Sequence, residues 1–352
     1  MKTIPLLPRL IAIAAAAAPV GAQTTGGATA LTIKGASDSR LSLPYQQPRV
    51  DGGTVAGVTA TSLVLAGETW VPGQFTRQAD GTGKVCYALF LDGPLEGVFY
   101  KVLSNNEDTL VLDTEGDKLN EHPLGAIPFG TRVDIVPYWT VAEVFGADEA
   151  SVLLEPRVSP LFPTDDLLLY DNGRSGINKA PVTTIYYRKN QGWRSVAAPS
   201  DSSAETILPP GAVFTVRRRG ATDLELINFG VYYRQRRAVF VAGGATEGND
   251  QYVSLLLPEP VTLDESNLSN GVVRPSASPL LRADEVLVWR SANPGFNQAP
   301  DTVLYYRPAI GWLKVGDNTP LGSSFSLAPG EAIIIRKKPS SPPAEWLQIP
   351  PP

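Results

Sequence analysis

The sequence predicts an all-β protein built from tandem small sandwich-like or barrel-like modules with an internal duplication. Three observations support this fold class. Glycine and proline each occur 32 times in 352 residues, and proline at that frequency disfavours long helices. Short runs of β-branched and aromatic residues alternate with turn residues along the chain, as in proteins made of many short strands. One long stretch of sequence also occurs twice, which indicates repeated supersecondary units.

The duplicated stretch covers Asp165–Arg217 and Asp284–Arg336, at a constant offset of 119 residues. Its identical residues fall in ordered groups, which are G-[IF]-N-x-A-P, T-x-x-Y-Y-R, G-W-x-x-V, L-x-P-G and a final arginine. Other matched positions exchange one apolar residue for another, as packing requires. A shorter repeat, D-x-x-[LV]-S, begins at Asp38 and again at Asp250. Together the repeats predict two tandem units.

The two predicted units differ in length because the first contains an insertion. The first unit takes residues 23–50 and 138–230, and the second takes residues 231–352. Residues 51–137 hold six short β-type runs separated by turn sequences such as Asp-Gly-Pro, a pattern typical of a small barrel. Within the duplicated stretch each strand is short and ends at Gly, Pro, Asn or Asp. The one helix expected is a turn or two over Trp139–Phe145.

The first 22 residues have the features of a secretory signal peptide. Lys2 and Arg9 precede an apolar run over Leu10–Ala18, and small residues follow, so cleavage is expected before Gln23. A buried N-terminal helix is the alternative. No later stretch approaches 18 consecutive apolar residues, so no transmembrane helix is expected in the mature chain. We therefore expect export to the periplasm, the outer surface or the extracellular space.

The supply of reactive side chains argues against several kinds of chemistry. Cys86 and His122 are the only residues of their types, and a nucleophilic triad or a zinc site needs more. Cys86 lies in an apolar run and is expected to be a buried strand residue. The formal net charge of −5 does not favour nucleic acid as a partner. The sequence thus predicts no catalytic residue, no cofactor and no metal site.

Three weaker alternatives stay open. An acid pair could hydrolyse glycosides, with candidates at Asp38, Asp165, Asp166, Asp250, Asp284 and Glu285. The recurring Asp165 and Asp284 are better explained as side chains that satisfy turn amides. Alternating acids over residues 113–117 could bind calcium, although a polar turn explains them as well. Arginines clustered over residues 217–237 could contact anionic polysaccharide or lipid headgroups, or protect strand edges.

The repeated aromatic residues are the strongest candidates for ligand binding. Adjacent tyrosines point to opposite faces of a strand, so one ring of each pair could face solvent and stack on a sugar beside its arginine. The candidate residues are Tyr187, Arg188 and Trp193 in the first copy and Tyr306, Arg307 and Trp312 in the second. Binding requires exposed rings at equivalent places on both units. The alternative is that the tryptophan and one tyrosine of each copy anchor the core.

The same blocks resemble a family of uncharacterised exported bacterial β-rich proteins. In that family, N-x-A-P, tyrosine and G-W blocks follow an opening similar to Asp38–Pro44 and an insertion that ends near the sequence P-Y-W-T, here at residues 137–140. The resemblance covers nearly all of the mature chain. It implies export and β architecture, and it brings no known activity and no catalytic residue.

Three hypotheses for function follow. The first is an exported, non-enzymatic β-repeat protein that is a structural or adhesive component of the cell envelope or extracellular matrix. Its expected partners are polysaccharide or other envelope proteins. The second is a carbohydrate-binding protein that uses the repeated Tyr, Trp and Arg surfaces. The third is a glycoside hydrolase-type enzyme with an acid pair.

Overall fold

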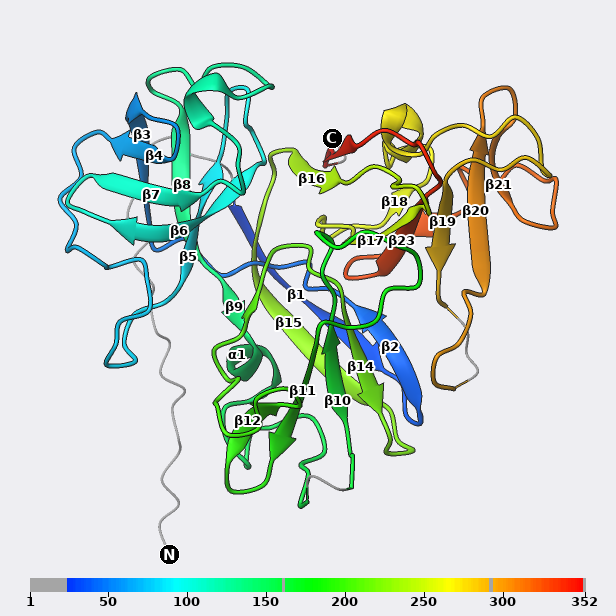
Figure 1. The fold of residues 1–352 in the computed structure, drawn as a ribbon, viewed down its shortest axis with the longest axis horizontal. Helices are drawn as coiled ribbons and strands as arrows, with labels where there is room; N and C mark the ends of the chain where they lie inside the picture. The colour runs from blue at the N-terminus through cyan, green and yellow to red at the C-terminus, as the bar shows by residue number, and fades with distance from the viewer. Residues whose placement is uncertain (1–23, 160–161, 291–293, 351–352) are drawn as a thin grey trace, which may run out of the picture.

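The computed structural model describes residues 24–159, 162–290 and 294–350, and it is nearly all β, with 40% strand and 4% helix. The predicted all-β class is therefore confirmed. Figure 1 shows three bodies, a barrel and two open sheets, which pack around a common centre. The predicted signal peptide lies outside the described residues. Among the described residues, no helix has the length and apolar character needed to cross a membrane.

The barrel is closed by six strands in the ring order β3-β4-β7-β6-β5-β8. These strands are β3 (Asp51–Val58), β4 (Ser62–Leu65), β5 (Cys86–Phe90), β6 (Phe99–Asn105), β7 (Thr109–Asp113) and β8 (Arg132–Pro137). A 3-10 turn, η1 (Leu119–Glu121), precedes β8. The barrel has its own apolar core, which includes Trp70, Phe75 and Phe90. Cys86 is buried in β5, as its apolar neighbours predicted.

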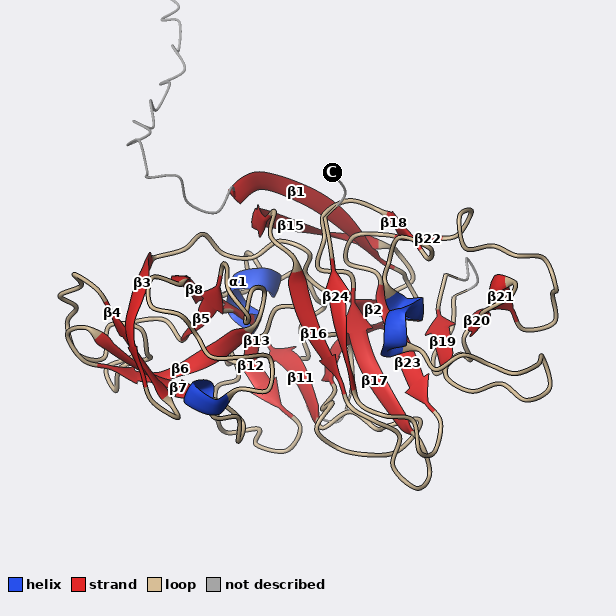
Figure 2. Ribbon diagram, turned by 90° about the horizontal axis from the view of Figure 1, so that it is seen from above, coloured by secondary structure: helices blue, strands red, loops and turns tan. Residues whose placement is uncertain are grey.

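The first open sheet has the order β12-β11-β10-β14-β2. Its strands are β12 (Gly192–Ser195), β11 (Thr183–Arg188), β10 (Asp166–Leu169), β14 (Phe214–Arg218) and β2 (Ser37–Leu41). Strand β1 (Thr24–Ile33) pairs with β15 (Leu224–Tyr233) in a long ribbon that runs beside this sheet (Figure 2), and β9 (Trp139–Thr140) pairs with β13 (Ile207–Leu208). Helix α1 (Val141–Phe145) lies in the predicted helical segment and starts with a capping box between Thr140 and Glu143.

The second open sheet has the corresponding order β21-β20-β19-β23-β17. Its strands are β21 (Gly311–Lys314), β20 (Thr302–Arg307), β19 (Glu285–Val288), β23 (Ala332–Lys337) and β17 (Asn249–Ser254). Strand β16 (Arg237–Val241) pairs with β24 (Ala344–Gln348), and β18 (Val261–Thr262) pairs with β22 (Ser326–Leu327). A π-type turn, η2 (Leu268–Val272), lies close to β24.

The strand registers of the two sheets also correspond. Phe214 pairs with Leu41 between β14 and β2, and Ile333 pairs with Val253 between β23 and β17. We call β1, β2 and β9–β15 the first unit, and β16–β24 the second unit. The predicted division after residue 230 lies inside β15, which continues to Tyr233. Each unit has its own core, and a smaller apolar cluster that includes Tyr252 and Leu287 joins the two sheets.

Candidate functional site in the contacts between the two units

The repeated tryptophans lie in the cores of the two units. Trp193 is 1% exposed and Trp312 is 0% exposed. The indole Nε1 of Trp193 donates to the main-chain oxygen of Gly146 at 2.7 Å. Tyr187 packs its ring against Trp193 at 5.3 Å, and Tyr306 packs against Trp312 at 5.5 Å. These rings stabilise the cores through burial and through ring packing that is edge-on in the first unit and tilted in the second.

The exposed aromatic platform expected for carbohydrate binding is therefore not present at these positions. Tyr187 is buried and Tyr306 is half-buried. Arg188 and Arg307 end β11 and β20 and are half-buried as well. The reason is the alternation of a strand, because the residue that pairs with each tryptophan shares its inward face. The alternative interpretation, that these residues are core anchors, agrees with the structure.

The repeated aspartates before β10 and β19 satisfy main-chain amides, as the sequence predicted. The carboxylate of Asp165 accepts from the N–H of Glu155 at 3.0 Å and of Arg219 at 2.8 Å. It also pairs with Arg218 at 2.6 Å. Because Asp165 is fully buried and its oxygens are occupied, it cannot reach a glycosidic bond in this conformation.

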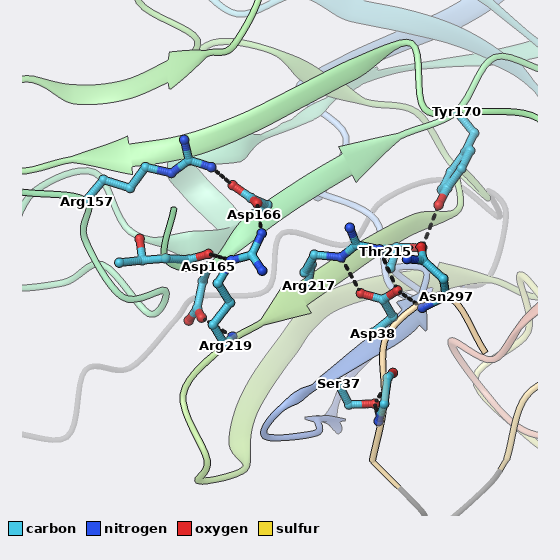
Figure 3. A network of polar contacts seen from close by, with 12 residues as sticks. Ser37, Asp38, Arg157, Asp165, Asp166, Tyr170, Thr215, Arg217, Arg219 and Asn297 are labelled. Carbon is cyan, nitrogen blue, oxygen red and sulfur yellow. Dashed lines mark hydrogen bonds and ion pairs between the residues drawn. The ribbon is translucent and has the colours of Figure 1, made fainter. Parts of the chain in front are cut away.

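Asp284 repeats this arrangement in the second unit. It accepts from the N–H of Arg274 and of Lys338, both at 2.9 Å, and from the hydroxyl of Ser341. Its ion-pair partner is Lys337, at 2.7 Å, and both side chains are completely buried. The residue after each aspartate is also paired. Asp166 contacts Arg157 and Arg219 (Figure 3), and Glu285 contacts Arg282 and Lys338.

The repeated Asn of each unit is held by the other unit. Asp38, in β2, receives two hydrogen bonds from Arg217 of β14, each 2.8 Å long. The same carboxylate accepts the main-chain N–H of Asn297 at 2.8 Å, and Arg217 donates to the Asn297 side-chain oxygen at 2.7 Å. Figure 3 shows Asp38, Arg217 and Asn297 together in this cluster. The Asn297 loop belongs to the second unit, so this cluster joins the two units.

The reciprocal cluster has the same bonds with the units exchanged. Asp250, in β17, accepts from Arg336 at 2.7 and 2.8 Å and from the main-chain N–H of Asn178 at 2.7 Å. Arg336 donates to the Asn178 side-chain oxygen at 2.8 Å. We call the two clusters together the clasp. In the clasp, the hydrogen bonds to each aspartate raise the pKa of Arg217 and of Arg336.

The conformation of the loop explains why asparagine occurs in both copies. Asn178 has φ 51° and Asn297 has φ 53°, a left-handed conformation that asparagine adopts more readily than most residues. The glycine two residues before each asparagine completes the contact. The main-chain oxygen of Gly295 accepts from the main-chain N–H of Asp38, and that of Gly176 accepts from the main-chain N–H of Asp250. Sequence analysis predicted a fixed loop geometry here but not its partner in the other unit.

Matched contacts surround the clasp. Tyr170 stacks on Tyr252 with centroids 4.2 Å apart, and at the corresponding place Arg40 lies over Trp289 at 4.0 Å. Ser42, which directly follows β2, corresponds to Ser254 at the end of β17. Their hydroxyl oxygens lie 2.8 Å apart. The interface is thus self-complementary, in the way that a symmetric dimer interface is.

Within the described residues, the other candidates from the sequence are buried or bonded to neighbouring groups. Among the described residues, no group of three or more His, Cys, Asp and Glu could hold a metal ion. Asp117, one of the acids considered for calcium, accepts instead from the hydroxyl of Tyr100 at 3.0 Å. His122 lies 3.2 Å from the same hydroxyl. Burial raises the pKa of the Cys86 thiol to about 12, which makes a thiolate nucleophile unfavourable.

Sequence analysis missed one repeated feature that is on the surface. The 119-residue offset extends upstream of the duplicated stretch, where S-P-L-F at residues 159–162 matches S-P-L-L at residues 278–281. Phe162 is 74% exposed and Leu281 is 71% exposed. The N–H of Phe162 donates to the main-chain oxygen of Ser159 at 3.2 Å, and the N–H of Leu281 donates to the Ser278 hydroxyl at 3.0 Å. Each residue thus closes a turn and presents an apolar side chain to solvent.

Comparison with protein-family models, curated proteins and solved structures finds no match to this chain. The resemblance to exported bacterial β-rich proteins therefore stays a prediction.

Proposed function

We propose that this chain is an exported, non-enzymatic protein with a structural or adhesive role in the cell envelope or extracellular matrix. The observation that carries the proposal is that different residues of the repeat make different kinds of contact. Its polar residues bond to one another in the clasp, and its tryptophans fill the cores. Phe162 and Leu281, just before the duplicated stretch, are 74% and 71% exposed, against 45% and 40% for the matched pair Ile177 and Phe296 in the clasp loops. Packing does not explain why both units keep them, and contact with a partner does.

Attachment through these two turns suits an adhesive protein. Contiguous exposed apolar area marks a contact surface, whereas single exposed apolar residues are common on any protein. Leu280, beside Leu281, is also exposed, which enlarges the apolar area. Two such turns in one chain give bivalent attachment, so weak individual contacts combine into strong retention. Polysaccharide or another envelope protein is the proposed partner.

Export is the part of the proposal that the N-terminal sequence supports. The basic residues, the apolar run and the small residues before Gln23 have the order of a cleaved signal peptide. The enzyme alternative has less support, because the repeated aspartates are buried and paired. The aromatic carbohydrate site has less support for the same reason, since Trp193 and Trp312 are buried.

The proposal is tested by co-sedimentation of the mature protein with isolated bacterial cell-wall and outer-membrane fragments. We expect Phe162→Ser and Leu281→Ser each to lower the apparent affinity roughly 100-fold, because either change removes bivalence. The double variant should not sediment. Phe240→Ser is the matched control, since Phe240 is equally exposed but lies in β16 outside the repeated turns. Unchanged sedimentation of the double variant contradicts the proposal.

A further inference from the structure

Arg237 is enclosed in the contact between the barrel and β16. Arg237 is 2% exposed, and none of its three guanidinium nitrogens has a hydrogen-bond partner among the described residues. The nearest aromatic ring, that of Tyr233, has its centroid 5.9 Å from the guanidinium carbon, at the outer limit of a cation–π contact. A buried guanidinium without an acceptor is strongly unfavourable.

Other buried cations in the same chain show what a satisfied site looks like. Lys337 is completely buried and contacts both Asp284 at 2.7 Å and the main-chain oxygen of Val272 at 2.6 Å. Arg218 is similarly buried and pairs with Asp165 at 2.6 Å. Arg237 is equally enclosed, yet it has neither a carboxylate nor a carbonyl partner in the described part of the chain.

The acids near this junction are already used by other arginines. Asp134, which is buried in β8, pairs with Arg49 at 3.0 Å. Glu96, at the neighbouring barrel turn, pairs with Arg236 at 3.4 Å. Desolvation by burial lowers the pKa of Arg237, and the groups that oppose this effect are Tyr87 and Tyr233, whose hydroxyls are neutral near pH 7. The junction therefore holds one uncompensated positive charge.

We propose that Arg237 is the cationic side of a binding site for a small monovalent inorganic anion, such as chloride or bromide, between the barrel and the second unit. One negative charge neutralises the guanidinium, whereas a doubly charged phosphate leaves a net buried charge. The barrel covers this position, because Gly97 packs directly on the backbone of residues 236–238. Arginine offers five N–H donors in a planar fork, enough to hold an anion that receives few other contacts.

The site would fix the barrel against the second unit. Arg237 begins β16, and the tyrosines beside it, Tyr87 of β5 and Tyr233 of β15, belong to the aromatic cluster that joins the barrel to the first unit. An anion bound here links groups from the barrel and from both units. Its removal is therefore expected to loosen the barrel before it affects the clasp.

The test combines diffraction with thermal unfolding of the mature protein. Crystals grown in sodium bromide should show an anomalous peak within hydrogen-bonding distance of the Arg237 guanidinium. Replacing gluconate by chloride at constant ionic strength should lower the unfolding equilibrium constant about 100-fold when chloride reaches 100 times its dissociation constant. Arg237→Met should lose this response, and Arg236→Met, which changes the neighbouring paired arginine, should keep it.

Two results would overturn the proposal. One is an equal response to chloride in the wild-type protein and in Arg237→Met. The other is bromide diffraction with no peak at Arg237, which decides the matter even if Arg237→Met does not fold. A peak that fits water alone, with the same occupancy in bromide and in gluconate, counts against the site in the same way.

Discussion

The first and second units perform the same structural tasks with partly different side chains. The clasp uses Asp, Arg and Asn in both units, and no substitution occurs there. The buried cation that pairs with the repeated aspartate differs between the units. It is Arg218 in the first unit and Lys337 in the second. The stacked pairs differ even more, with Tyr170 on Tyr252 in one place and Arg40 on Trp289 in the other.

This comparison separates two kinds of requirement. Where a contact depends on a left-handed backbone and on two parallel hydrogen bonds, one set of side chains satisfies the geometry and the residues are identical. Where a contact needs only a positive charge or a flat group, different residues serve. Identity between the copies therefore marks strict geometry and does not by itself mark a ligand site.

The largest expected effect concerns the buried ion pairs, where the units differ. Asp165→Ala and Asp284→Ala should each lower the free energy of unfolding by about 3–5 kcal/mol, because each leaves a buried cation unpaired. Lysine can lose its proton when its partner is removed, whereas arginine cannot. The loss in Asp284→Ala should thus shrink between pH 7 and pH 9 relative to wild type, while that in Asp165→Ala should not.

Urea unfolding of both variants at the two pH values measures this difference. Glu247→Ala, at an exposed position, is the control and should change stability by less than about 0.5 kcal/mol. Equal, pH-independent losses in both units would show that the arginine and the lysine are equivalent here.

An intermediate loss of unfolding free energy is expected at the repeated asparagines, which are identical in the two units. Asn178→Ala and Asn297→Ala should each cost about 2 kcal/mol, since both lose the arginine contact and force alanine into a left-handed conformation. Asn→Gly at the same positions keeps the backbone conformation accessible and should cost about 1 kcal/mol. Unequal costs in the two units, measured by urea unfolding, would mean that the clasp is not reciprocal.

The smallest effect concerns the barrel, which has no counterpart in the second unit. The pKa of Cys86 is raised to about 12 by burial, against about 8.5 in an unfolded chain. Stability should be unaffected well below pH 8.5 and should fall by about 1 kcal/mol between pH 8.5 and pH 9.5, because only the unfolded chain then loses the thiol proton. This range lies below the pH at which the tyrosines of an unfolded chain ionise. Cys86→Ala should remove this dependence.

Reaction with a thiol-specific reagent provides a second measurement. Native protein at pH 8 should react with it slowly, and the rate should rise to that of a free thiol in urea. Labelling of the native protein at the free-thiol rate would place Cys86 outside the barrel core.

Much of the fold could be predicted because it depends on local pattern. The six short runs of residues 51–137 form the closed barrel, and the helix near Trp139 occurs where its capping residues allow it. The use of Asp165 for turn amides was also predictable, since this role is local. Strand alternation suggested that one ring of each tyrosine pair could face solvent, but neither ring of either pair is exposed. Packing against other segments covers the second face as well, and Arg157 lies over the Tyr186 ring.

The candidate sites were harder to predict because they depend on contacts between distant segments. Asp38 and Asn297 meet across the unit boundary, and nothing in their spacing indicates it. The two repeats that contain them were visible, but their mutual contact was not. Arg237 was predicted only as one member of the arginine cluster over residues 217–237. Its burial beside the barrel could not be predicted, since it depends on contacts between distant segments.

The central claim is that the repeated Asp, Asn and Arg residues join the two units. A double-mutant cycle on Arg217→Met and Asn297→Ala, followed by urea unfolding, tests it most directly. The two residues belong to different units and share a 2.7 Å hydrogen bond, so we expect a coupling energy of about 1–2 kcal/mol. The reciprocal cycle on Arg336 and Asn178 should give the same value. Additive losses in both cycles, with coupling below about 0.3 kcal/mol, would contradict the claim.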